Sequence, residues 1–88
     1  MRLIVVDDES LIRMDLVDIL EAAGHQVLAQ GTNGVEAIAL AKEHQPDVIL
    51  MDVKMPELDG IEAARQIARH RLAPVVLLTA YSQEDLVN

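Results

Sequence analysis

Acidic side chains follow two apolar runs of this sequence at the point where each run ends. Asp7 and Asp8 come directly after residues 3–6, and Asp52 comes directly after residues 48–51. If both runs are neighbouring parallel strands, their carboxyl ends meet at one edge of a sheet and the three carboxylates converge there. Like charges that close repel one another unless a cation holds them. Mg²⁺ prefers oxygen ligands, so the pattern predicts a magnesium site.

A cluster of this kind can support phosphoryl transfer. A cation that bridges carboxylate and phosphate oxygens neutralises charge during transfer, and a nucleophilic carboxylate beside it can accept the group as an acyl phosphate. Thr79 follows another apolar run, at residues 75–78, and its hydroxyl could donate to a phosphoryl oxygen. Taken alone, Thr79 fits a β-branched strand terminator equally well, and the acids fit a solvated helix start. The combination favours the site, because acids after two central strands and a Thr after a third are unexpected by chance.

Short aliphatic runs alternate with stretches of helical period. The runs at residues 3–6, 26–29, 48–51 and 75–78 predict strands, and the stretches between them predict crossover helices. The resulting order, βαβαβαβ, is typical of an α/β fold with a doubly wound parallel sheet. We expect the flavodoxin-like order 2-1-3-4, with the mixed second strand at an edge. The first helix is predicted from an apolar period that ends before Gly24: Ile12, Leu16, Ile19, Leu20 and Ala23.

The last predicted strand has an unusual character. Residues 75–78 are as apolar as an interior strand, although nothing later in the sequence could pair with their other side. Ser82 followed by Asp85 resembles the start of another helix. We therefore expect residues 1–88 to form one domain that is incomplete at its C-terminus, with a fifth strand missing.

Composition narrows the classes of function. The formal net charge of −8 disfavours direct nucleic acid binding, and one Tyr with no Phe or Trp leaves no aromatic platform for single strands. Without Cys, the chain has no disulfide or thiolate zinc site. The sequence has neither a signal peptide pattern nor a run of membrane-spanning length. We expect no membrane association and a cytoplasmic location.

Four motifs run through the chain in the predicted element order. They are Asp-Asp-Glu-Ser at 7–10, Asp-Val-Ile-Leu-Met-Asp at 47–52, Met-Pro at 55–56 with Asp-Gly at 59–60, and Pro-Val-Val-Leu-Leu-Thr-Ala at 74–80. Together they resemble the receiver domain of two-component response regulators. The resemblance covers the whole chain, and its strength lies in the agreement of several spaced motifs with the element order.

The resemblance implies a role for each candidate residue. Asp52 would accept a phosphoryl group from a sensor histidine kinase in a Mg²⁺-dependent reaction. Asp8 would bind the metal directly and Asp7 largely through water, with the Lys54 backbone carbonyl as a third ligand. Thr79 would be the switch hydroxyl. The implied protein is a signalling domain that switches an output domain, and not an enzyme. The resemblance leaves open whether the protein forms a homodimer.

A narrower likeness concerns the output. Residues 11–16, 52–56, 71–74 and 81–87 resemble the receivers of antitermination regulators, whose C-terminal helical domain binds RNA. This likeness implies transcription antitermination or another form of gene regulation. Any contact with RNA would then belong to the output domain and not to this acidic segment.

Three other functions compete with this one. The family has a Lys on its fifth strand that this chain does not contain, so the alternative is a degenerate, unphosphorylated receiver that acts as a dimerisation scaffold. A phosphatase of the haloacid dehalogenase type would need a second Asp where this chain has Lys54. A flavodoxin would need a phosphate-binding loop after the first strand, where Asp7, Asp8 and Glu9 would repel phosphate instead.

Overall fold

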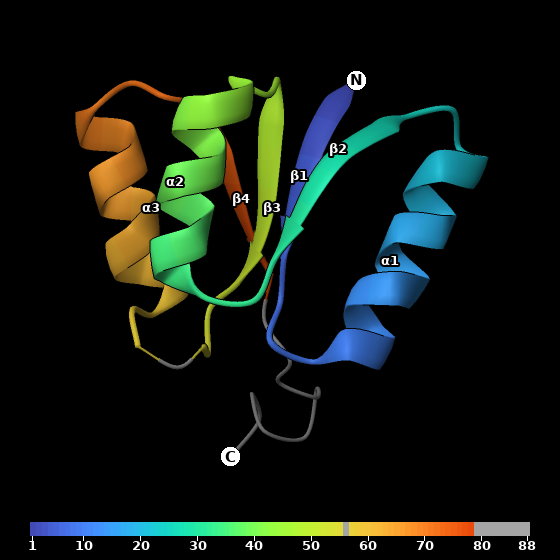
Figure 1. Ribbon diagram of the computed structural model, residues 1–88, viewed down its shortest axis with the longest axis horizontal. Coiled ribbons are helices and arrows are strands. Elements are labelled where there is room, and N and C mark those ends of the chain that lie inside the picture. Colours follow the sequence, from blue (N-terminus) through green and yellow to red (C-terminus); the bar gives the residue numbers. More distant parts are fainter. Residues whose placement is uncertain (56, 79–88) are drawn as a thin grey trace, which may run out of the picture.

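A parallel sheet with helices on both faces forms the framework of the protein (Figure 1). The computed structural model describes residues 1–55 and 57–78. Within them the sheet has the order β2-β1-β3-β4. The elements along the chain are β1 (Arg2–Val6), α1 (Ser10–Ala22), β2 (Gln26–Gly31), α2 (Gly34–His44), β3 (Val48–Asp52), α3 (Gly60–Arg69) and β4 (Val75–Leu78).

The predicted fold is confirmed. The order of elements is βαβαβαβ, the strand order is 2-1-3-4, and β2 lies at an edge of the sheet. Helix α1 covers one face of the sheet, and α2 and α3 lie side by side on the other (Figure 1). Strands β1 and β3 pair in a register that places Val6 opposite Met51. Asp7, which follows Val6, and Asp52, the last residue of β3, therefore lie next to each other at this edge.

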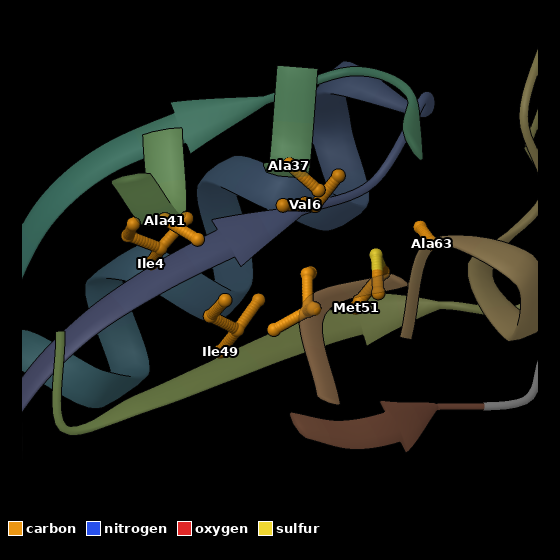
Figure 2. Close-up of a cluster of buried hydrophobic side chains, with 8 residues drawn as sticks. Ile4, Val6, Ala37, Ala41, Ile49, Met51 and Ala63 are labelled. Atoms are coloured by element: carbon orange, nitrogen blue, oxygen red, sulfur yellow. The ribbon is translucent and has the colours of Figure 1, made fainter. Parts of the chain in front are cut away.

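The hydrophobic core lies between the sheet and the pair formed by α2 and α3. Alternate residues of the central strands point toward these helices, as period-two side-chain geometry requires. The helices meet them largely with alanines, whose small side chains allow the helix backbones to approach the sheet closely (Figure 2). The fully or almost fully buried members are Ile4, Val6, Ala37, Ala41, Ile49, Met51, Ala63 and Ile67. Burying each larger member contributes roughly 1.5–3 kcal/mol relative to exposure.

Side chains cap the starts of two helices. Asn33 accepts a hydrogen bond from the backbone N–H of Glu36 at the start of α2, over 2.8 Å. Asp59 does the same for Glu62 at the start of α3, over 2.8 Å. These caps satisfy backbone donors that a helix leaves unpaired. The predicted end of α1 is also confirmed, since the helix stops at Ala22 and Gly24 has a φ of 93°.

The apolar period of α1 predicts packing that the structure only partly contains. Val17 is the buried residue of this helix, whereas Ile12 is 47% and Ile19 65% exposed. On β4, Val76 is 48% and Leu77 38% exposed. Helix α1 packs against β1 and β2, so the side of its apolar face that looks toward β4 has no covering element among the described residues.

None of the helices in the described part of the chain has both the length and the apolar character that a bilayer crossing requires.

Candidate functional site

Three carboxylates meet at the carboxyl edge of the sheet. One oxygen from each of Asp7, Asp8 and Asp52 lies within 4.8 Å of the other two. Asp7 is 6% and Asp52 9% exposed, while Asp8 faces solvent. The predicted convergence is confirmed, and its cause is the β1–β3 register that ends both strands at the same level. The group offers hard oxygen ligands at a spacing that a divalent cation could bridge.

Asp7 is held in place on three sides. Its backbone N–H donates to the Gly31 carbonyl of β2 over 3.0 Å. One of its carboxylate oxygens accepts from the Glu9 N–H over 2.9 Å, and its backbone carbonyl accepts from the Arg13 guanidinium over 2.7 Å. The first and third bonds hold the Asp7 backbone and the second orients its carboxylate, whose other oxygen has no hydrogen bond among the described residues and can act as a ligand.

The environment of Asp52 disfavours its negative charge. Burial raises the pKa of the Asp52 carboxyl above its usual value, and the Asp7 carboxylate raises this pKa further. Hydrogen bonds from the backbone N–H groups of Lys54 and Val53 act in the opposite direction. A cation bound among the carboxylates would remove the repulsion and favour the ionised, nucleophilic form of Asp52.

The loop that follows Asp52 is tethered by two glycines. The Gly60 N–H donates to the Val53 carbonyl over 2.9 Å, and the Gly34 N–H donates to the Leu58 carbonyl over 3.0 Å. A Cβ atom on Gly34 would come closer than 3.0 Å to the Leu58 carbonyl, and one on Gly60 would clash in the same way with the Asp52 carbonyl. Both glycines therefore allow helices to approach the loop backbone.

Sequence reasoning missed these tethers and the role of Arg13. No periodicity or motif could have shown them, because each contact joins segments that come together only after the sheet has formed. Lys54 lies in the tethered loop, and its carbonyl stays a predicted ligand. Thr79 lies outside the described residues, and its role stays a prediction.

An open groove adjoins the carboxylates on the α1 face. Its polar lining residues are Asp7, Glu9, Asp15 and Asp52. Its remaining lining is mostly apolar and comes from α1 and β4, with Ile12, Leu16, Ile19 and Leu78 as the apolar members. The acidic cluster is thus reached from solvent beside an apolar surface.

Comparison with known proteins assigns this arrangement to a family. Residues 3–88 match the family model for the response regulator receiver domain. The chain belongs to this family. The receiver domain is 51% identical over 86 residues to the transcriptional regulatory protein PdtaR of Mycobacterium tuberculosis (strain H37Rv), a match that covers 98% of this chain and 42% of PdtaR. It thus spans less than half of that relative's length.

Two further comparisons place the receiver domain by sequence and by fold. The chemotaxis protein CheY of Bacillus subtilis is 39% identical over 87 residues, which cover 98% of this chain and 72% of CheY. The solved signal receiver domain of the response regulator NarL from Mycobacterium tuberculosis superimposes with a TM-score of 0.88 at 33% identity, over 98% of this chain and 71% of that one. The flavodoxin-like topology is therefore shared with solved receiver domains.

Proposed function

We propose that this receiver domain takes a phosphoryl group from a sensor histidine kinase onto Asp52, with Mg²⁺ held by Asp7, Asp8 and Asp52. The observation that carries the proposal is the cluster of three carboxylates at the ends of β1 and β3. Membership of the receiver family supports the reaction, since this family works through such an acidic pocket. The Lys54 carbonyl is proposed as a further metal ligand. The Thr79 hydroxyl is proposed as the switch group that donates a hydrogen bond to a phosphoryl oxygen.

The residues of the chain account for the chemical step. A carboxylate oxygen of Asp52 attacks the phosphorus of a phosphohistidine. The new O–P bond forms as the P–N bond breaks, and the electron pair returns to the imidazole nitrogen of the kinase. The backbone N–H groups of Lys54 and Val53 lower the pKa of Asp52 and so favour its ionised, nucleophilic form. Bound Mg²⁺ would supply charge neutralisation on the phosphoryl oxygens.

The residues present fit Mg²⁺ in their chemistry. The three side chains supply oxygens and no nitrogen or sulfur, which suits a hard cation. Burial is the first cause of the raised pKa of Asp52, and the repulsion from the adjacent Asp7, which a bound cation would offset, is the second. Asp7 is already positioned by the Glu9 N–H, so a cation would meet an arranged ligand.

For the whole protein, we propose control of gene expression by transcription antitermination. The support is the 51% identity to PdtaR, which is named a transcriptional regulatory protein, and the motif likeness described above. The net charge of −8 supports an output through another domain, because this segment would repel RNA. We also propose that the receiver domain dimerises.

A phosphorylation assay tests the proposal. The full-length protein is incubated with acetyl phosphate and Mg²⁺, and its intact mass is measured. We expect a gain of one phosphoryl group that a chelator abolishes and that Asp52→Asn prevents. Asp59→Asn is the matched control, because it removes a nearby carboxylate outside the cluster and keeps a side chain that can cap α3. A protein that gains no mass and binds no Mg²⁺ would instead be the unphosphorylated scaffold.

A further inference from the structure

Arg13 connects the acidic turn to the edge of the sheet. It lies in α1, half-buried, and its Nη1 donates to the Asp7 backbone carbonyl over 2.7 Å. Its Nε donates to the side-chain oxygen of Gln30 over 3.1 Å. Gln30 belongs to β2 and pairs with Val5 of β1. The guanidinium thus bridges two points that the fold places beside the carboxylate cluster.

The bond to Asp7 affects Asp8 through the peptide plane. The Asp7 carbonyl belongs to the peptide unit that joins the two residues, and this unit is planar. Fixing the direction of the carbonyl therefore fixes the N–H and the Cα position of Asp8. The Asp8 side chain is exposed and has no hydrogen bond or ion pair within the described residues. Its placement depends on the backbone, and Arg13 is the side chain that holds this backbone unit.

We infer that Arg13 is a positioning residue for the Mg²⁺ site, which it serves by holding the Asp7–Asp8 peptide in the orientation that presents both carboxylates to the cation. The inference rests on the proposed function, since it assumes that these carboxylates bind Mg²⁺. Gln30 assists by fixing the plane of the guanidinium. The two bonds leave Arg13 with a defined geometry that a flexible cation such as Lys would not reproduce.

Electrostatics alone makes the opposite prediction. A guanidinium close to the acidic cluster competes with Mg²⁺ for the same negative potential. If Arg13 acted only through its charge, removing it would tighten Mg²⁺ binding. If it acts by positioning, removing it weakens Mg²⁺ binding despite the more negative potential. The sign of the change therefore separates the two roles.

Mg²⁺ titrations of variants test the inference, with backbone amide chemical shifts as the readout. We expect Arg13→Ala to weaken Mg²⁺ binding about tenfold, the lower end of the effect of groups that orient metal ligands. Arg13→Lys keeps the charge, and its Mg²⁺ affinity should lie between those of Arg13→Ala and the unaltered protein. The matched control is Arg65→Ala on α3, which removes the same charge from an exposed side chain paired with Glu62 over 3.1 Å. This control should leave the affinity within twofold.

Thermal unfolding in chelator separates positioning from general damage. Titrations are made at a temperature where every variant is fully folded, so that lost stability alone cannot lower the affinity. Unchanged or tighter Mg²⁺ binding by Arg13→Ala would overturn the inference while leaving the proposed function in place. Absence of Mg²⁺ binding by the unaltered protein would overturn both. The effects of Gln30→Ala and Arg13→Ala on Mg²⁺ affinity should not add in the double variant, because both substitutions break the same bridge.

Discussion

The backbone N–H of Gly34 donates to the carbonyl oxygen of Leu58 over 3.0 Å, which joins the start of α2 to the loop that follows Asp52. A side chain at position 34 would displace the Leu58 carbonyl. The loop that carries Lys54 is therefore held from outside by a residue distant in sequence. The contact therefore links the packing of α2 to the segment that follows Asp52.

Gly34→Ala should destabilise the protein strongly. The added methyl group meets backbone, which cannot move aside as a side-chain end can, so we expect the free energy of unfolding to fall by about 2–3 kcal/mol. Gly31→Ala is the matched control. Its new methyl group would meet the end of the Leu40 side chain at 3.2 Å, and we expect a change within about 1 kcal/mol. Urea unfolding of both variants measures the difference, and equal losses would contradict the steric account.

Asp52→Asn should stabilise the metal-free protein at neutral pH. The pKa of Asp52 is raised in the folded state, first by burial and then by Asp7. The folded state consequently binds this proton more tightly than the unfolded state, and stability falls as the pH rises above the unfolded pKa and through the higher folded pKa. Replacing the acid removes this loss. Unfolding in chelator across that pH range should show the advantage of Asp52→Asn growing with pH; an advantage that is constant or shrinks would contradict it.

Mg²⁺ should stabilise the unaltered protein more than it stabilises Asp52→Asn. A cation that binds only the folded state stabilises it in proportion to the logarithm of its concentration relative to the dissociation constant. The unaltered protein has all three carboxylates and should gain more from Mg²⁺ than Asp52→Asn does. Thermal melting with increasing Mg²⁺ measures both gains. Equal gains would remove Asp52 from the set of metal ligands.

Glu36 should show the opposite dependence on pH. Its carboxylate accepts from the Thr32 hydroxyl and from the Thr32 N–H, and these bonds lower the pKa of Glu36. Its contribution to stability is complete above the unfolded pKa and is lost as the pH falls through the lower folded pKa. Glu36→Gln should therefore differ from the unaltered protein mainly at neutral pH, by a small amount because the group is exposed. Glu21→Gln, on exposed α1 surface, is the charge control; an equal effect there would refute a specific role for the Thr32 bonds.

The sequence predicted the framework because local patterns determine it. Continuous aliphatic runs identified the central strands, and the acids after two of them identified the edge where the carboxylates meet. The packing of α1 was predicted less well, since periodicity gives a helix an apolar face without saying which neighbour covers it. Ile19 belongs to that face and is 65% exposed.

Contacts between distant segments lay beyond sequence reasoning. Gly34 reads as a turn residue, and its contact with Leu58 depends on how α2 packs beside the β3–α3 loop. Arg13 reads as a charged residue on the polar side of a helix. Its bond to the Asp7 carbonyl depends on the angle at which α1 leaves β1, which no local pattern encodes.

Locating the phosphoryl group tests the central claim most directly. The full-length protein is phosphorylated with acetyl phosphate and Mg²⁺ and then treated with borohydride, which reduces an acyl phosphate on Asp to homoserine. Peptide mass spectrometry then identifies the reduced position. The account predicts homoserine at position 52 and at neither Asp7 nor Asp8. Reduction at another carboxylate, or a phosphoryl group on a hydroxyl or imidazole that borohydride leaves intact, would contradict it.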